Sequence, residues 1–314
     1  MDTAVLASIV GAATPLVFAV VGETISEKAG VVNLSLEGTI MLSAMTAFAT
    51  ASATDSVIVG YLAGAAVGGF LALIIAFSSI QLRLNQIAVG FVLTLLAIKL
   101  SSFIGDPFVG QQGAAVPHVG IPLLQNIPFL GRVFFDHNLS VYGSYLALIG
   151  AYLFLYRTRK GLVLQAVGER PEAAFARGVD VNRLRYVTTV VGGMFAGIAG
   201  AAFSLDVILG WREGLTSNYG WIALAIVIFG GWNPLRAAIG AYLFGALQVT
   251  ALKLQPELPS LSQILGIFPF VLMIALLVIV YLPSFRRFGE RHRVAGRFLA
   301  GDPPSALGTA FSRE

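Results

Sequence analysis

The sequence predicts an all-α, polytopic integral membrane protein with about nine transmembrane segments (about 8–10) and one short helix outside the membrane. Of its 314 residues, 57% are hydrophobic and only 11% are charged, and the mean hydropathy is +0.83. The chain is therefore far more apolar than an average soluble domain. Several apolar windows approach or exceed the roughly 20 residues that span a bilayer. The charged residues gather between these windows.

The long apolar windows are the candidate transmembrane segments. They lie at residues 4–22, 31–50, 57–77, 86–104, 139–156, 186–206, 219–232, 235–254 and 264–282. The first Lys or Arg is Lys28, so no basic region precedes the first window, and we expect a retained anchor rather than a cleaved signal peptide. The window at 219–232 is short for a full crossing, so it either crosses obliquely or is re-entrant.

Basic segments predict which loops are cytoplasmic. The segment Arg157–Arg185 carries seven of the 20 Lys and Arg, and five arginines lie in 286–297. Positive charge marks the cytoplasmic side, so 1–285 reads as one membrane domain with a cytoplasmic loop at 157–185. Counting back places 105–138 outside as an external loop and Glu23–Gly30 inside as a loop. Residues 286–314 form a basic cytoplasmic tail, which we expect to be disordered from Gly301 onward.

Glycine and proline patterns predict two further features. The external loop 105–138 is rich in Pro and Gly with apolar residues between them, which is typical of an ordered cap. Two ridges of small residues have the spacing that lets membrane helices approach closely. One ridge is Gly60, Gly64 and Gly68, and the other is Gly193, Gly197 and Gly200.

The cytoplasmic loop contains a short helix with a start and a stop signal. Pro171 suits the first helical position, and Gly178 suits the left-handed residue that ends a helix. Glu169 and Glu172 lie at its start and Arg177 at its end, where the helix dipole favours those charges. About two turns are not stable alone in water, so the helix must pack on its own membrane domain or on a partner protein.

The sequence offers no catalytic or metal-binding motif. None of the four lysines follows a glycine, so there is no phosphate-binding GK[ST] loop, and the three histidines lack metal-ligand spacing. The chain has no cysteine, which excludes disulfides and thiol chemistry. The net charge of +4 follows from the basic loops, so nucleic acid is not an expected partner. If the protein uses ATP, another chain must hold it.

Polar residues in two apolar windows are candidates for a solute path. Asn33, Ser35 and Glu37 lie at the start of the second window, and Asn33 and Glu37 share a face if the segment is helical. A charge inside a membrane is costly, so Glu37 should face protein or a watery cavity. It either ties neighbouring helices together near the cytoplasmic interface or lines a pathway.

The fourth window carries a second polar stripe. Gln86, Gly90 and Thr94 recur every four residues and stack along one helix side, and Phe91 adjoins them. A polar stripe beside an aromatic ring suits a polar, ring-bearing solute. The alternative is a set of hydrogen bonds between helices.

Three stretches together resemble a known family. They are GETISEKAGVVNLSLEG at 22–38, AVGERPEAAFARGV at 166–179 and GWIALAIVIFGGWNP at 220–234. They are similar to the permease subunits of bacterial ABC importers, in the nucleoside and simple-sugar branch related to ribose and branched-chain amino-acid permeases. Glu172-Ala173-Ala174 followed by Gly178 matches the EAA-x-x-x-G pattern that such permeases use where they contact the ATPase.

The resemblance implies a multi-pass permease of the bacterial cytoplasmic (inner) membrane, surrounded by lipid, that imports nucleosides. Its implied partners are a second permease subunit in a heterodimer, a cytoplasmic ABC ATPase that holds ATP and Mg, and an external solute-binding protein or lipoprotein. The implied coupling residues are Glu169, Pro171, Glu172, Ala173, Ala174, Phe175 and Gly178. The implied path residues are Asn33, Ser35, Glu37, Gln86, Gly90, Phe91 and Thr94.

Three alternatives remain open at this stage. The same type of permease could carry a simple sugar such as ribose, or branched-chain amino acids. A stand-alone secondary transporter is a less favoured reading, because inverted repeats and central charges are not evident. A membrane-embedded enzyme is less favoured too, because no carboxylate or histidine cluster lies at one depth.

Overall fold

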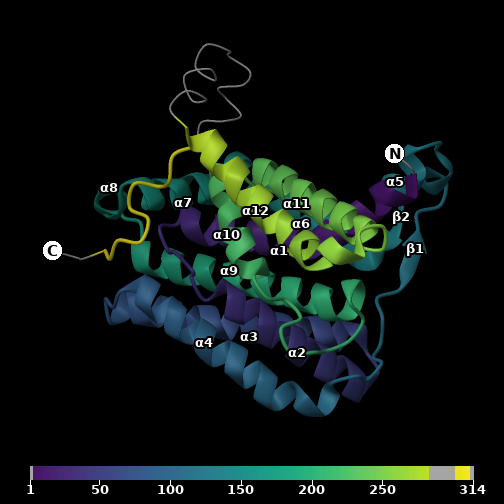
Figure 1. Ribbon diagram of the computed structural model, residues 1–314. Coiled ribbons are helices and arrows are strands. Elements are labelled where there is room, and N and C mark those ends of the chain that lie inside the picture. The colour runs from purple at the N-terminus through teal and green to yellow at the C-terminus, as the bar shows by residue number, and fades with distance from the viewer. Residues whose placement is uncertain (1–2, 283–300, 312–314) are drawn as a thin grey trace.

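The computed structural model describes residues 3–282 and 301–311 and places a helix in each of the nine predicted apolar windows (Figure 1). The bounds are α1 Thr3–Lys28, α2 Leu36–Thr54, α3 Val57–Ala76, α4 Gln86–Gly105, α6 Leu139–Arg157, α9 Val181–Ala202, α10 Tyr219–Phe229, α11 Pro234–Leu254 and α12 Ser262–Tyr281. Three shorter α-helices are α5 Leu130–Phe134, α7 Arg159–Glu169 and α8 Pro171–Ala176. Single π-helical turns, Phe77–Gln81 and Phe203–Val207, extend α3 and α9.

Seven helices in the described part of the chain are long and apolar enough to cross a membrane. The prediction of about nine spans differs from this at α2 and α10. The Glu, Ser and Thr residues of α2 lower its hydropathy, and its helix begins at Leu36 rather than at residue 31. The 11 residues of α10 rise only about 16 Å, roughly half of a hydrocarbon core. The chain is thus a polytopic helical membrane protein.

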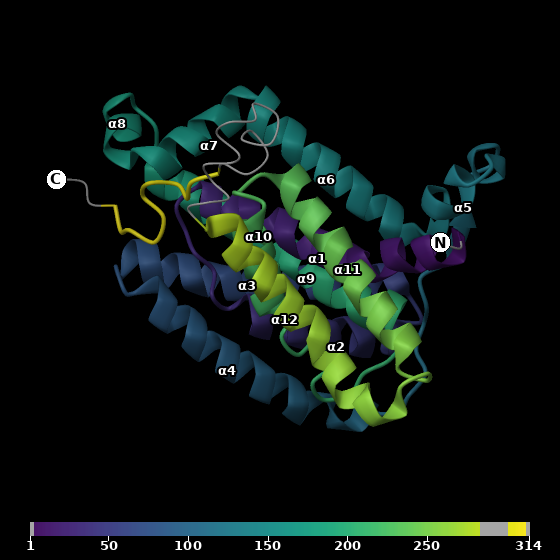
Figure 2. The same ribbon diagram turned by 45° about the horizontal axis from the view of Figure 1, so that its top comes forward.

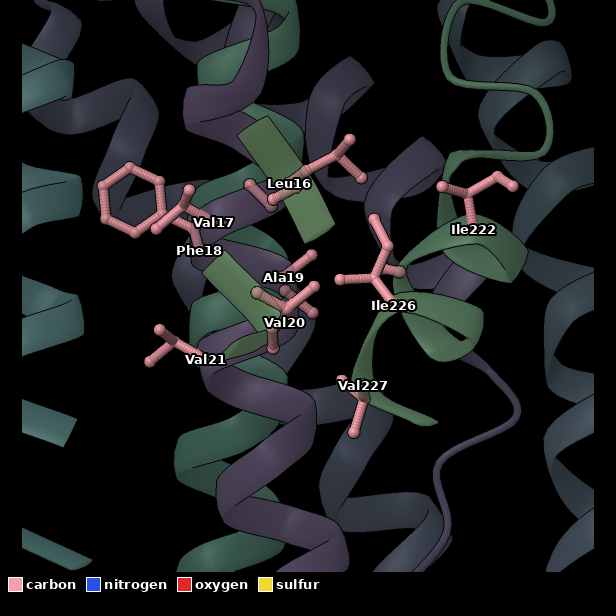
Figure 3. Packing of buried hydrophobic residues seen from close by; sticks show 14 of the residues in the cluster. Leu16, Val17, Phe18, Ala19, Val20, Val21, Ile222, Ile226 and Val227 are labelled. Carbon is pink, nitrogen blue, oxygen red and sulfur yellow. The ribbon is translucent and has the colours of Figure 1, made fainter. Parts of the chain in front are cut away.

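The core forms around α1, which is apolar on all sides and therefore buried. Nearly every residue of α1 from Ile9 to Glu27 is buried. In Figure 3, Leu16 and Val20 lie on the side of α1 that faces Ile226 of α10, while Val17, Phe18 and Val21 lie on its opposite side; all belong to one buried cluster. The short helix α10 is consequently held within the bundle by the apolar surface of α1.

Gly64 and Gly68 of one predicted ridge pack against Gly193 and Gly197 of the other where α3 meets α9, while Gly60 and Gly200 pack on α2. A Cβ atom added to Gly193 would lie 2.5 Å from the carbonyl oxygen of Gly68, and one added to Gly64 would lie 3.0 Å from that of Gly197. No larger side chain fits at such a distance. The prediction of close helix packing at these residues is confirmed.

The two ends of the bundle carry different structures (Figures 1 and 2). One end carries α7, α8 and residues 301–311. The other carries most of the loop 105–138, which is ordered as predicted and holds two short antiparallel strands, β1 His118–Gly120 and β2 Asp136–Asn138. Three 3₁₀ turns, Asp106–Phe108, Leu124–Asn126 and Pro259–Leu261, complete the secondary structure. Among the residues that the structure describes, this two-stranded sheet is the one departure from an all-α fold.

Two predictions about loops were wrong. Residues Glu23–Gly30 are not a loop, because α1 continues to Lys28 and buries both of its glutamates. Residues 301–311 are not disordered, because their backbone binds the domain: Ala306 N–H donates to Gly168 O at 2.9 Å, and Gly308 N–H to Gly30 O at 3.0 Å. The arginines at 286–297 lie outside the described residues.

Candidate functional site

A break in helical structure between α1 and α2 organises the first group of candidate residues. Residues 29–35 lack regular structure, and Gly30 adopts a left-handed conformation with φ +93°. Asn33 stabilises the turn, because its Oδ1 accepts hydrogen bonds from Ser35 N–H at 3.1 Å and Ser35 Oγ at 2.6 Å. Asn33 therefore lies before the helix, not on the same helix face as Glu37.

One face of α4 holds this break in place. Gln86 Oε1 accepts a hydrogen bond from Val32 N–H at 2.9 Å, and Thr94 Oγ1 donates one to Leu34 O at 2.9 Å. Between them, Gly90 lies so close to Leu34 that an added Cβ would be 2.8 Å from the Leu34 Cβ. The backbone groups Val32 N–H and Leu34 O, which have no partner within a helix, thus form hydrogen bonds with side chains of α4. Inside a membrane no water is present to bind them, so such partners are required.

Glu37 caps the N-terminus of α10 from a distant part of the chain. Its Oε1 accepts from Asn218 N–H at 2.6 Å and its Oε2 from Gly220 N–H at 2.7 Å. The side chain is 4% exposed. The first N–H groups of a helix lack partners within it, and an anion there also complements the helix dipole.

The structure therefore brings six of the seven predicted path residues together and leaves one outside. The one outside is Phe91, which is 51% exposed. The hydrogen bonds of Gln86, Thr94 and Glu37 are ties between helices, which is one of the two alternatives that the sequence left open. Their role in a path stays a prediction.

Two buried glutamates of α1 complete the site, and the sequence patterns did not single them out. Glu23 Oε1 accepts from Asn33 N–H at 3.1 Å, and Glu27 accepts a hydrogen bond from Trp232 Nε1. They are 1% and 4% exposed, and neither forms an ion pair within the part of the chain that the structure covers. The spacing of four residues between Glu23 and Glu27 is compatible with one face of a helix and could have identified them. Their charge instead favoured the prediction of a loop.

The short helix α8 has the predicted ends and one buried face. It begins at Pro171, and Gly178 after it has φ +83°. Ala174 packs with Val167 and Val181. The short helix was expected to pack either on its own membrane domain or on a partner protein. One face of α8 does pack on its own domain.

The other face of α8 is exposed and carries the remaining candidate coupling residues. Glu172 and Ala173 face solvent, and Phe175 is 40% exposed. The Phe175 ring also contacts Phe311, with 5.6 Å between ring centroids. Glu169 Oε2 accepts a hydrogen bond from Ser305 Oγ at 2.7 Å. Residues 301–311 thus brace α8 at both ends.

Arg185 joins the break and the C-terminal segment. Its Nε donates to Ala29 O at 3.0 Å and its Nη1 to Thr309 O at 2.8 Å, while only 1% of the residue is exposed. A guanidinium is well suited to bind two carbonyls at once, because its donors are fixed in one plane. The region around α8 is therefore connected by hydrogen bonds to the α1–α2 break.

The fold and these sites define a polytopic membrane permease domain. Residues 5–277 match the family model described as branched-chain amino acid transport system / permease component, and the chain belongs to this family. It is 37% identical to a putative glucose ABC transporter permease protein of Haloferax volcanii, over 97% of this chain and 96% of the relative.

Two further relatives align with nearly as much of the chain. The chain is 32% identical to a nucleoside ABC transporter permease protein of Lactococcus lactis, over 85% of this chain and 88% of the relative. It is 31% identical to a guanosine ABC transporter permease protein of Bacillus subtilis, over 87% and 92%. No solved structure matches the chain significantly.

Proposed function

We propose that this chain is the permease subunit of an ATP-driven importer of nucleosides. The observation that carries the proposal is its similarity, over more than four fifths of both chains, to permease proteins named for nucleosides and guanosine. The protein is a transport component rather than an enzyme. A simple sugar is the alternative solute, favoured by the relative named for glucose, and branched-chain amino acids are a further one, from the family description.

The chain works with partners in this proposal. A second permease subunit completes the path, a cytoplasmic ATPase holds ATP and Mg, and an external binding protein or lipoprotein delivers the solute. The complex lies in a bacterial cytoplasmic membrane, with the basic loop 157–185 and the α8 end facing the cytoplasm. In this proposal the helix bundle, which includes the short helix α10, forms the walls of the path.

The exposed face of α8 is the proposed contact with the ATPase. Glu172, Ala173 and Phe175 are available there, and a short helix that is supported on one face only is well placed to gain order from a partner. Movement of α8 reaches the α1–α2 break through the C-terminal segment and Arg185. The break, with its partners on α4, is the element whose rearrangement would open or close the path.

Uptake of labelled solutes tests the solute. Cells that express the importer are given radiolabelled guanosine in competition with unlabelled nucleosides, glucose, ribose or leucine. Nucleoside import predicts competition by nucleosides alone. Competition by sugars alone would transfer the proposal to its alternative.

Variants of α8 test the coupling. Glu172→Lys reverses a charge on the exposed face, and Gly178→Trp forces a side chain onto a left-handed residue. Both should leave membrane insertion intact and separate ATP hydrolysis from uptake. Lys253→Glu, an exposed charge reversal on α11, is the matched control. Normal uptake in both α8 variants would refute the coupling role.

Accessibility tests the sidedness. The chain has no cysteine, and Ala173 and Ala115 are both exposed, so single cysteines there can be labelled selectively. The proposal predicts that an impermeant reagent outside the cell labels only the cysteine at position 115. Labelling at position 173 from outside would contradict both the topology and the ATPase contact.

A further inference from the structure

A groove between α6 and α9 takes no part in the sites described above. It encloses about 830 Å³ and opens at the surface of the bundle. Its walls are apolar, formed by Leu146, Gly150 and Phe154 on α6 and by Val187, Val191 and Phe195 on α9. A Cβ atom added to Gly150 would meet no other atom within 4 Å, so the middle of the groove is open.

One end of the groove is basic. Arg159, Lys160 and Arg183 line it beside α7, and all three are exposed. Within residues 3–282 and 301–311, no ion pair involves any of these cations. The one acidic residue of the lining is Asp180, whose Oδ1 accepts the Arg183 N–H and so caps α9. The basic end thus carries a net positive charge.

The groove has the length of one membrane leaflet. Beyond Arg183, its lining on α9 runs from Leu184 to Phe195, and the 11 steps between these residues rise about 16 Å. Half of a hydrocarbon core of roughly 30 Å is about 15 Å. An apolar channel of this length with cations at the α8 end matches the order of acyl chain and phosphate in a lipid of that leaflet.

We propose that this groove binds one anionic phospholipid. The phosphate lies against Arg159, Lys160 and Arg183, and an acyl chain lies along the apolar walls. Basic pockets between membrane helices favour anionic headgroups. A zwitterionic lipid is disfavoured, because its own cation would face the three basic side chains. The proposal requires only that the α8 end lies at a membrane surface, so it holds for any solute and either direction of transport.

Lipid titration of the intact importer tests the site. The complex, purified in mild detergent with its partner subunits, is titrated with dioleoyl phosphatidylglycerol or dioleoyl phosphatidylcholine, and bound lipid is counted by native mass spectrometry. Phosphatidylglycerol should bind with the higher affinity. Each basic side chain near a membrane surface contributes roughly a fivefold gain, so Arg159→Gln, Lys160→Gln and Arg183→Gln together should weaken binding about 100-fold.

Two further variants separate the contributions of the groove and the charge. Gly150→Trp fills open space and should abolish lipid binding while inorganic phosphate still binds the basic end. Arg157→Gln removes an exposed cation at the end of α6 that does not line the groove, and should leave binding unchanged. Thermal stability of each complex, measured in parallel, reports that the variants are folded.

Several results would overturn the proposal. Equal binding of both lipids would show that the three cations do not select an anionic headgroup. If folded Gly150→Trp still bound phosphatidylglycerol, the lipid would not lie in this groove. Cross-linking of a single cysteine at Leu146 or Val187 to the second permease would identify that subunit as the occupant. None of these results depends on uptake, so they leave the proposed transport function untouched.

Discussion

The substitution Glu37→Gln tests whether Glu37 stabilises the N-terminus of α10 or acts directly on solute. The two carboxylate oxygens accept from Asn218 N–H and Gly220 N–H at 2.6 and 2.7 Å. A glutamine keeps one of these oxygens and replaces the other with an NH₂ group, which would face a backbone N–H. One hydrogen bond is lost and the remaining one is no longer charge-assisted.

The expected loss follows from ordinary hydrogen-bond energies. A bond to a charged acceptor contributes about 1.5–3 kcal/mol and a neutral bond about 1 kcal/mol. Glu37→Gln replaces two such bonds with one neutral bond and should therefore lower the free energy of unfolding by about 2–5 kcal/mol. Glu37→Ala, which removes both acceptors, should cost about 3–6 kcal/mol.

Heating the purified importer and counting the intact chain by size-exclusion chromatography measures this effect. Glu213→Gln is the matched control, because that carboxylate is exposed and accepts a hydrogen bond from the side chain of Ser102, with 3.0 Å between Oε1 and Oγ, rather than capping a helix. A cap predicts a lower melting temperature for Glu37→Gln alone, with uptake falling in proportion to folded protein. Unchanged stability together with lost uptake would refute the cap and favour direct contact with solute.

Three more predictions address other parts of the fold. Gly193→Ala should destabilise the importer by about 1–3 kcal/mol through overlap with α3, whereas Gly11→Ala, which has open space, should not; thermal unfolding measures both. Phe311→Ala should expose α8 and speed tryptic cleavage after Arg177, while Phe311→Leu should preserve most of the protection. Hydrogen bonds that the His118 ring donates to Asp136 Oδ1 and Asn138 Oδ1 raise the pKa of His118 above its ordinary value of 6.5. This stabilisation is fully present below about pH 6.5 and is lost as the pH rises through the raised pKa. The difference in melting temperature between the wild type and His118→Gln should accordingly be largest near pH 5 and vanish in alkaline buffer.

The sequence predicts the helices well because apolar windows are local features. All nine windows contain a helix, and Pro171 and Gly178 predict the ends of α8 within a residue or two. The glycine ridges predict that α3 and α9 approach other helices closely, because small residues at this spacing allow close packing in a membrane, but they do not show that the two helices contact each other.

Local patterns of this kind did not predict the structure of the break between α1 and α2. Glu23 and Glu27 resemble loop residues until their partners are known, and Trp232 lies 205 residues after Glu27. Likewise, Gln86 was correctly placed on a polar stripe, but its partner Val32 lies 54 residues earlier. The same reason explains residues 301–311, whose polar and small side chains indicate disorder, while their order comes from backbone hydrogen bonds with α7 and Gly30.

The position of Arg185 also sets an order for biosynthesis. Its acceptor at Thr309 is added 124 residues later, which at about 5–20 residues per second means a wait of roughly 6–25 s. Until Thr309 has been synthesised, Nη1 of Arg185 lacks this carbonyl acceptor, although α1 and α9 have already been synthesised. The end of the domain that carries α8 therefore gains this hydrogen bond only after residues 301–311 have been synthesised. A ribosome that stops early releases a protein whose helices are complete but whose α8 has no brace.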